Sequence, residues 1–182
     1  MVYVGWATVL SGLVFARRSR LAPALAALMG GVALFVSNLN WLDPQITPLV
    51  PVLKSYWLMI HVSVVTASYG FFGICAACGI ASLAATAFGR NLRELRAINE
   101  MAMIVGLALL TAGIFFGAVW ANESWGRYWG WDPKETWALI TMFAYALATH
   151  SRHIPWLDGP FAFDVLSVVC FATVLMTFFG VN

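Results

Sequence analysis

The sequence predicts an all-α fold, a polytopic membrane helix bundle with about six transmembrane helices. The chain of 182 residues is 62% hydrophobic and only 10% charged, whereas soluble domains carry about 25% charged residues. Its mean hydropathy is +0.83, and apolar segments alternate with short polar ones along its whole length. A chain of this length allows one domain, which we expect to be a single membrane domain over residues 1–182.

Six apolar segments are the expected helices, and their lengths decide which can span a bilayer. They cover Val2–Ala16, Leu21–Trp41, Tyr56–Phe88, Met101–Trp120, Thr136–Thr149 and Phe161–Val181. A spanning helix needs about 20 residues, with a range of roughly 17 to 25. The second, fourth and sixth segments meet this length, whereas the first is short and the fifth qualifies only with its polar flanks. The third segment is too long for one upright span, so it must tilt or extend beyond the bilayer.

The basic residues divide the loops into two sets and so predict the orientation. One set holds Arg17, Arg18, Arg20, Arg90, Arg93, Arg96 and Arg152; the other holds only Lys54, Arg127 and Lys134. Because basic loops face the cytoplasm, the loops at about 42–55 and 121–135 are expected on the external side of a cell inner (plasma) membrane, with both chain ends. An external start without a cleavable signal peptide suggests a piece of a longer protein. The net charge of +2 is too small and scattered for a nucleic-acid partner.

The most informative feature is the tryptophan segment, Trp125–Trp137, which holds four tryptophans, two glycines and a tyrosine. Aromatic belts at membrane interfaces are common, but they do not require interleaved glycines. If the segment coils helically, Trp125 and Trp129 share one face, and Gly126 and Gly130 form a bare stripe that a flat ring can approach closely. We therefore predict a site for a flat aromatic ligand, of which haem fits best. The candidate platform consists of Trp125, Gly126, Arg127, Tyr128, Trp129, Gly130, Trp131, Asp132 and Glu135.

Asp132 and Glu135 have a structural interpretation beside the binding one. The order Asp132-Pro133-x-Glu135 is typical of a helix start, with an N-cap aspartate, proline in the first turn and a glutamate that closes a capping box. Both carboxylates then pin the segment to the fifth helix, and a role as catalytic acid is the less favoured alternative.

Two histidines are candidate axial ligands of haem iron. His61 lies about one turn inside the external end of the third segment, where an ionisable group indicates function; a histidine satisfied by a neighbouring helix is the equal alternative. His150 ends the fifth segment, where a cation favoured by the helix C-terminus is the alternative. The fifteen residues from Glu135 to His150 span roughly 22 Å as a helix. One iron cannot bind both histidines, so two haem positions are implied if both histidines bind haem.

The cysteines do not indicate a redox site. Cys75-Ala-Ala-Cys78 lies within an apolar helical run, where a thiolate is costly to form and small residues favour close helix packing. No Cys-x-x-Cys-His occurs in the chain, so it is not itself a c-type cytochrome.

The tryptophan segment, Trp-Gly-Arg-Tyr-Trp-Gly-Trp-Asp-Pro-Lys-Glu-Thr-Trp, resembles the tryptophan-rich (WWD) signature of the haem-handling proteins of cytochrome c maturation. The match is better to the CcsA branch (CcsBA/ResC) than to the CcmC or CcmF branches. Residues 51–62, Pro-Val-Leu-Lys-Ser-Tyr-Trp-Leu-Met-Ile-His-Val, also resemble the CcsA branch ahead of its first external histidine. The resemblance runs from about Leu42 to Asn182.

The resemblance implies a System II function. His61 matches the first external haem ligand, and His150 matches the membrane histidine that receives haem from the cytoplasmic side. The tryptophan segment then holds haem b, as cargo, and presents it for thioether attachment to the Cys-x-x-Cys-His of apocytochrome c. A CcsB-type membrane partner is implied, as part of a holocytochrome c synthase (haem lyase). Family members continue into a segment with a second external histidine, whereas this chain stops at Asn182, so we expect a fragment that is not active alone.

The alternatives to this function belong to other classes of membrane protein. A cytochrome b-like transmembrane electron carrier needs paired histidines at one depth, which His61 and His150 do not provide. A haem exporter without ligation activity is a second alternative. A transporter or channel for another solute needs polar residues along several spans, and the spans offer few charges beyond Asp164 and His150. A purely structural membrane subunit leaves the tryptophan segment unexplained.

Overall fold

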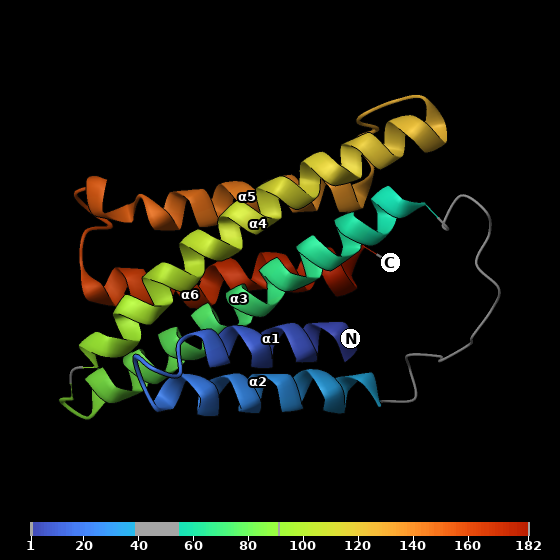
Figure 1. Cartoon of the computed structure of the whole chain (residues 1–182). Coiled ribbons are helices and arrows are strands. Elements are labelled where there is room, and N and C mark those ends of the chain that lie inside the picture. The colour runs from blue at the N-terminus through green and yellow to red at the C-terminus, as the bar shows by residue number, and fades with distance from the viewer. Residues whose placement is uncertain (1, 39–54, 91, 182) are drawn as a thin grey trace.

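The structure, a computed structural model that describes residues 2–38, 55–90 and 92–181, confirms the all-α membrane helix bundle (Figure 1). Within these ranges there are six α-helices and no strand. The helices are α1 (Val2–Val14), α2 (Leu21–Ser37), α3 (Tyr56–Ala87), α4 (Arg93–Trp125), α5 (Pro133–Thr149) and α6 (Pro160–Leu175). A 3-10 turn, Ser151–His153, follows α5, and a π-helical turn, Met176–Gly180, extends α6.

Three helices are long and apolar enough to cross a membrane: α3 with 32 residues, α4 with 33, and α6 together with its turn, 21 residues. The predicted third segment is therefore one long helix. The second is shorter than predicted, since α2 ends at Ser37; the external loop predicted at 42–55 lies outside the described residues except for Ser55. By contrast, α4 starts eight residues before the predicted Met101, because Leu95 and Ile98 are buried against the bundle and carry the helix into the charged segment.

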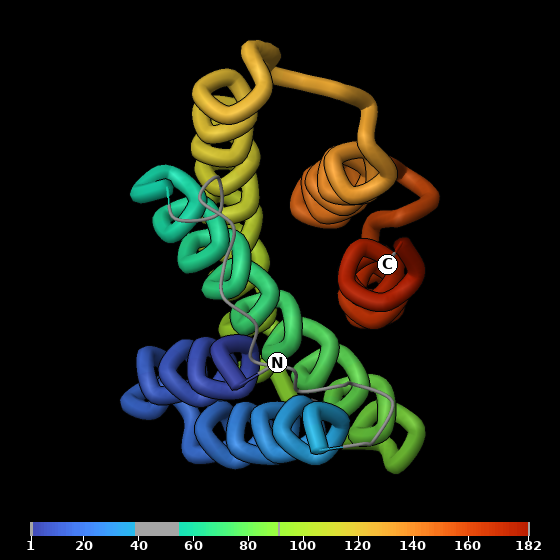
Figure 2. Tube along the Cα trace, turned by 90° about the vertical axis from the view of Figure 1, so that its right-hand side faces the viewer, coloured from blue at the N-terminus to red at the C-terminus, as the bar shows by residue number. Residues whose placement is uncertain are grey.

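The long helix α3 is the centre of the bundle, because it packs against α1, α2, α4 and α6. Viewed from the end that carries both termini, α1 and α2 form a pair on one side, and α5 and α6 form a second pair on the other (Figure 2). In this view the segment that joins α4 to α5 runs from the end of α4 across to the α5–α6 pair. This arrangement leaves the halves of α3 and α4 nearest the tryptophan segment facing the α5–α6 pair.

Small residues let the helices approach closely, as is common in membrane proteins. A Cβ added to Gly12 of α1 would lie 2.1 Å from the Cβ of Ala26 on α2. A Cβ on Gly70 of α3 would lie 2.7 Å from the backbone of Ala7, and one on Gly79 would lie 2.8 Å from the carbonyl oxygen of Asp164 on α6. These glycines set the spacing of α1 from α2 and of α3 from α1 and α6.

Gly12→Ala should destabilise the protein by about 1–3 kcal/mol, because the extra methyl group overpacks the contact with Ala26. Gly31→Ala is the matched control: Gly31 also lies within a helix, and no described atom lies within 4 Å of the added Cβ. Thermal unfolding in detergent micelles measures both. If the Gly12 variant were as stable as the control, α1 and α2 could move apart without loss of free energy of unfolding, and the close contact at Gly12 would not contribute to stability.

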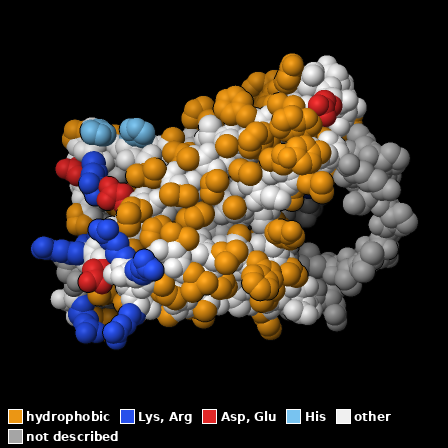
Figure 3. Space-filling view, in the orientation of Figure 1, with side chains coloured by type: hydrophobic (Ala, Val, Ile, Leu, Met, Phe, Trp, Pro, Cys, Tyr) orange, Lys and Arg blue, Asp and Glu red, His pale blue; other side chains and the backbone are white. Residues whose placement is uncertain are grey.

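Basic side chains gather at one end of the molecule (Figure 3). This end holds the α1–α2 turn, the α3–α4 turn and the α5–α6 connection, and the tryptophan segment lies at the opposite end. The predicted grouping of the seven arginines at one end is thus confirmed. A band of apolar side chains covers the surface between the two ends in this view, as suits a protein surrounded by lipid.

Two buried polar contacts tie α6 to α4 near the basic end. Arg96 Nε donates to Asp164 Oδ2 at 2.8 Å, and the Asp164 side chain is fully buried. One turn further along, Asn99 Nδ2 donates to Ser167 Oγ at 2.7 Å. Charged and polar groups within a membrane helix are held by such partners, and these contacts fix α6, whose far end contributes to the candidate site.

Candidate functional site

The tryptophan segment is not helical through its length, so the predicted stripe of two glycines does not form. Helix α4 ends at Trp125, and Gly126 caps it in a left-handed conformation (φ 68°), with its N–H donating to the carbonyl of Asn122 at 2.8 Å. Glycine adopts this conformation without steric cost. The i, i+4 relation between Trp125 and Trp129 is therefore lost, and the chain turns across to α5.

The start of α5 confirms the predicted capping box. Asp132 Oδ1 accepts from the N–H of Lys134 at 2.8 Å, and Pro133 is the first helical residue. Glu135 Oε2 accepts from the N–H of Gly130 at 2.8 Å and from that of Asp132 at 3.3 Å. Both carboxylates are thus occupied with holding the segment rigid.

Trp131 lies between the two N–H groups that Glu135 holds, and its backbone is left-handed (φ 56°). This conformation is unusual for a bulky side chain and costs roughly 1–2 kcal/mol. The Glu135 carboxylate maintains it, as an anion does in a concave nest of backbone N–H groups. The result is that Trp131 is directed outward, with 70% of its surface exposed.

A cavity of about 960 Å³ lies between the halves of α3 and α4 nearest the tryptophan segment, the start of α5 and the turn after α6. We call it the tryptophan cavity. Its volume is at the upper end of the 300–1,000 Å³ typical of ligand pockets. Of the predicted platform, Trp125, Arg127, Tyr128, Trp129, Asp132 and Glu135 line it, whereas Gly126, Gly130 and Trp131 do not.

His61 also lines the tryptophan cavity, and so the structure brings this predicted ligand to the predicted platform. Its Nδ1 lies 2.7 Å from the carbonyl oxygen of Gly113 on α4. A carbonyl only accepts, so Nδ1 carries the proton and Nε2 keeps its lone pair. A metal-binding histidine commonly donates its second ring N–H to a backbone carbonyl in this way.

The indoles form two edge-to-face pairs. The rings of Trp120 and Trp125 are 4.6 Å apart at 68°, and those of Trp129 and Trp131 are 5.8 Å apart at 87°. The Nε1 of Trp129 is buried without a hydrogen-bond partner among the described residues. A buried indole N–H normally has a partner, so Trp129 offers a donor to a ligand in the cavity.

Two cations, Arg127 and Lys134, lie at the rim of the tryptophan cavity. The Arg127 guanidinium lies against the backbone of Gly130, where an added Cβ would be 2.9 Å from its Cζ. Gly130 thus makes room for Arg127 rather than for a flat ligand. The cations suit carboxylate groups, and the apolar rings below them suit the body of a large aromatic ligand.

His150 lies at the other end of the molecule and is not part of the tryptophan cavity. It caps the C-terminus of α5, is exposed, and holds the Ala146 carbonyl with Nδ1 at 2.8 Å. The predicted separation of His61 and His150 therefore agrees with the fold. The geometry fits a cation at a helix C-terminus, and it also leaves Nε2 as the nitrogen that can bind a metal.

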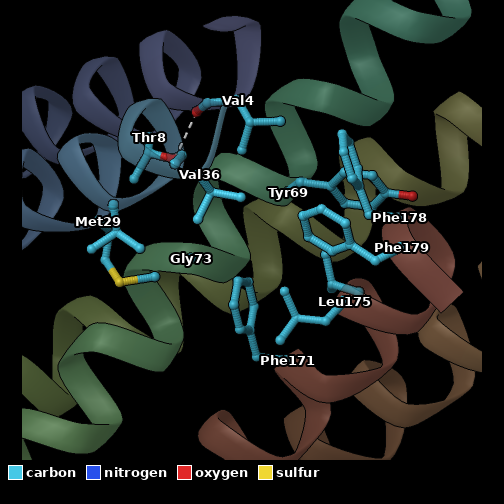
Figure 4. A pocket seen from close by; sticks show the side chains of 13 residues that line it. Val4, Thr8, Met29, Val36, Tyr69, Gly73, Phe171, Leu175, Phe178 and Phe179 are labelled. Atoms are coloured by element: carbon cyan, nitrogen blue, oxygen red, sulfur yellow. Dashed lines mark hydrogen bonds between the residues drawn. The ribbon is translucent and has the colours of Figure 1, made fainter. Parts of the chain in front are cut away.

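Further cavity residues come from outside the predicted platform, among them Tyr69 on α3, Gly117 on α4 and Phe178 on the turn after α6. Tyr69 and Phe178 also line a second, apolar cavity of about 130 Å³ between α1, α2, α3 and α6 (Figure 4). Their rings, 6.4 Å apart and edge to face, form the wall between the two cavities. The Thr8 hydroxyl in the second cavity donates to the Val4 carbonyl at 2.8 Å, and the lining residues are otherwise mostly apolar.

The cysteines lie away from the tryptophan cavity, as free, buried thiols. Cys75 Sγ donates to the Asn99 carbonyl at 3.5 Å, and Cys170 Sγ donates to the Ala144 carbonyl at the same distance. These contacts link neighbouring helices and agree with the prediction of a packing role.

Comparison with known proteins identifies the family. The whole chain, residues 1–182, matches the family described as cytochrome C assembly protein. Protein NrfI of Wolinella succinogenes is 48% identical over 190 residues, which cover 100% of this chain and 21% of NrfI. Cytochrome c biogenesis protein CcsA of Guillardia theta is 34% identical over 215 residues (100% of this chain, 70% of the relative), and that of Chlamydomonas reinhardtii is 38% identical over 146 residues (76% and 41%).

The chain thus spans about a fifth of NrfI and less than half of the Chlamydomonas protein. These relatives agree with the resemblance that the tryptophan segment carries. Because the family match covers every residue, this chain, a membrane protein, belongs to the cytochrome c assembly protein family and is of the CcsA type.

Proposed function

We propose that this chain binds haem b, as cargo, in the tryptophan cavity and presents it for covalent attachment to apocytochrome c. The observation that carries the proposal is the placement of His61, with Nε2 available, in the same cavity as the aromatic side chains Trp125, Tyr128 and Trp129. A neutral imidazole is a common axial ligand of haem iron. The names of the relatives, cytochrome c biogenesis proteins, support the same function.

The residues of the cavity divide the task of holding haem. The indoles and Tyr128 exclude water and bury the macrocycle, and His61 holds the iron. Arg127 and Lys134 at the rim suit the two propionates. In the attachment reaction each thiol of Cys-x-x-Cys-His adds across a vinyl double bond: sulfur bonds to one vinyl carbon and the thiol hydrogen ends on the other. The haem and the thiols carry this chemistry, and the protein contributes position.

The orientation and partners belong to the same proposal. The positive-inside rule places the arginine-rich end in the cytoplasm, and thus the tryptophan cavity at the external face of a plasma (inner) membrane. His150, near the cytoplasmic end, then serves as an earlier haem position. A CcsB-type membrane partner completes a holocytochrome c synthase, of which this chain is one part. The opposite ends occupied by His61 and His150 disfavour a cytochrome b-like electron carrier.

The test is the absorption spectrum of the detergent-purified chain titrated with haemin, oxidised and reduced. Wild-type protein should bind haemin with a Soret band that sharpens when imidazole is added. Trp125→Leu combined with Trp129→Leu should lower haem affinity by about 10-fold, since each indole contributes roughly 0.5–1.5 kcal/mol of ring contact. Trp156→Leu, at the opposite end and 79% exposed, is the control.

Equal haem affinity in the double variant and the control would favour a plain interfacial belt and would count against the platform. Failure of the wild-type chain to bind haemin would contradict the proposed function for this chain.

A further inference from the structure

We infer that Gly117 is a positioning residue for His61. Gly117 and the Gly113 carbonyl together set the orientation and the tautomer of the His61 imidazole, so that Nε2 binds the iron. This inference rests on the proposed function and adds to it two residues of α4 outside the tryptophan segment.

The imidazole of His61 lies between two facing helices, α3 and α4. His61 and Val65 lie four residues apart on α3, and Gly113 and Gly117 lie four residues apart on α4, so each pair shares one face. The helices run in opposite directions, and His61 lies against Gly117 while Val65 lies against Gly113. A Cβ on Gly113 would be 2.5 Å from Val65 Cγ2. Gly113 therefore lets α3 come close enough for the imidazole to reach α4.

The imidazole of His61 occupies the space beside Gly117. A Cβ on Gly117 would lie 2.7 Å from His61 Cε1 and 2.8 Å from Nδ1. Both distances are shorter than a carbon atom tolerates, so any side chain at 117 must displace the ring. The ring is meanwhile tethered by the 2.7 Å hydrogen bond from Nδ1 to the Gly113 carbonyl. Gly117 and Gly113 thus form a seat that fits an imidazole in one orientation.

The hydrogen bond to the Gly113 carbonyl determines which nitrogen of His61 can bind a metal. With Nδ1 held by the carbonyl, Nε2 is the only ring nitrogen with a lone pair. Outer-shell contacts of this kind orient a ligand and raise its basicity, and their loss typically costs 10–100-fold in metal affinity. The Gly113 carbonyl belongs to the backbone, so no side-chain substitution removes it. The close approach of the His61 ring to Gly117 can be changed by substitution, so Gly117 is the residue to test.

Gly117→Ala, titrated with haemin, tests the seat. We expect haem affinity to fall 10–100-fold, the wild-type Soret band to be lost because the displaced ring no longer holds the iron, and free imidazole to restore that band. Gly31→Ala, a helical glycine with no described atom within 4 Å of the new Cβ, should behave as wild type. A Gly117→Ala protein with wild-type affinity and Soret band would overturn the inference.

A second measurement requires neither haem nor the Gly117 variant. The chain has three histidines, so ¹⁵N chemical shifts of the labelled apoprotein can be assigned by replacing each in turn. His61 should show a protonated Nδ1 and an unprotonated Nε2 at neutral pH. The reverse tautomer, or an equal mixture, would overturn the inference even if the protein binds haem. The expected tautomer in a protein that binds no haemin would support the seat and contradict the proposed function instead.

Discussion

Replacing His61 with glycine should remove the protein's ligand to haem iron and lower haem affinity by at least about 100-fold, which corresponds to roughly 2.7 kcal/mol. The reason is geometric: His61 is the one histidine that lines the tryptophan cavity, and its Nδ1 is already bound to the Gly113 carbonyl at 2.7 Å. Glycine leaves a space of the size of the ring, so added imidazole should partly recover both the affinity and the Soret band. Haemin titrations with and without imidazole measure the effect.

His153→Ala is the matched control for this experiment, because His153 lies in the turn after α5 at the opposite end of the molecule. It should leave haem affinity and the spectrum unchanged. Unchanged haem binding by the His61 variant as well would remove His61 from the site and leave the aromatic side chains as a platform without an iron ligand.

The second large effect is expected at the far end of the bundle. Asp164→Ala should destabilise the protein by about 3 kcal/mol or more, because it leaves the partly buried Arg96 guanidinium without its carboxylate. The pair joins α4 to α6 at 2.8 Å, and the Asp164 side chain is fully buried. Unfolding of the detergent-solubilised protein by heat or denaturant measures the loss.

The chain provides a control with the same chemistry and a different environment. Arg152 and Glu100 form an ion pair at 2.7 Å, also near the basic end, but their side chains are 68% and 37% exposed. Glu100→Ala should therefore cost no more than about 1 kcal/mol. Similar losses from both substitutions would show that burial does not set the strength of these pairs.

The Asp164 variant also separates stability from ligation. Helix α6 continues into the turn that brings Thr177 and Phe178 to the tryptophan cavity, and the Thr177 hydroxyl lies 3.2 Å from that of Thr141 on α5. A loosened α6 should weaken haem binding without changing the type of spectrum, because His61 and Gly113 lie on α3 and α4. Loss of the His61 side chain should change the spectrum itself.

Local features were predictable from the sequence because they depend on neighbours in the chain. Asp132, Pro133 and Glu135 specify a helix start by their spacing alone, and the structure contains that capping box. The separation of His61 from His150 follows from the rise of a helix. Composition required a helical membrane bundle, since a chain in lipid must satisfy its backbone hydrogen bonds internally.

The direction of each side chain in the tryptophan segment was not predictable in this way. A continued helix would have aligned Gly126 with Gly130, but Gly126 ends α4 and Gly130 packs against Arg127. Trp131 turns outward because the Glu135 carboxylate holds the N–H groups on both sides of it. These outcomes depend on hydrogen bonds that compete with helix formation.

The fold class, the helix start at Asp132, the basic end of the molecule and the family could all be predicted from the sequence, since each depends on composition, local spacing or the tryptophan signature. The contacts of His61 with Gly113 and Gly117, and the place of Tyr69 and Phe178 in the wall of the cavity, are known from the structure alone. These residues lie about 50 to 110 positions apart in the chain. Their contacts depend on how closely α3, α4 and α6 pack, which helix periodicity does not specify.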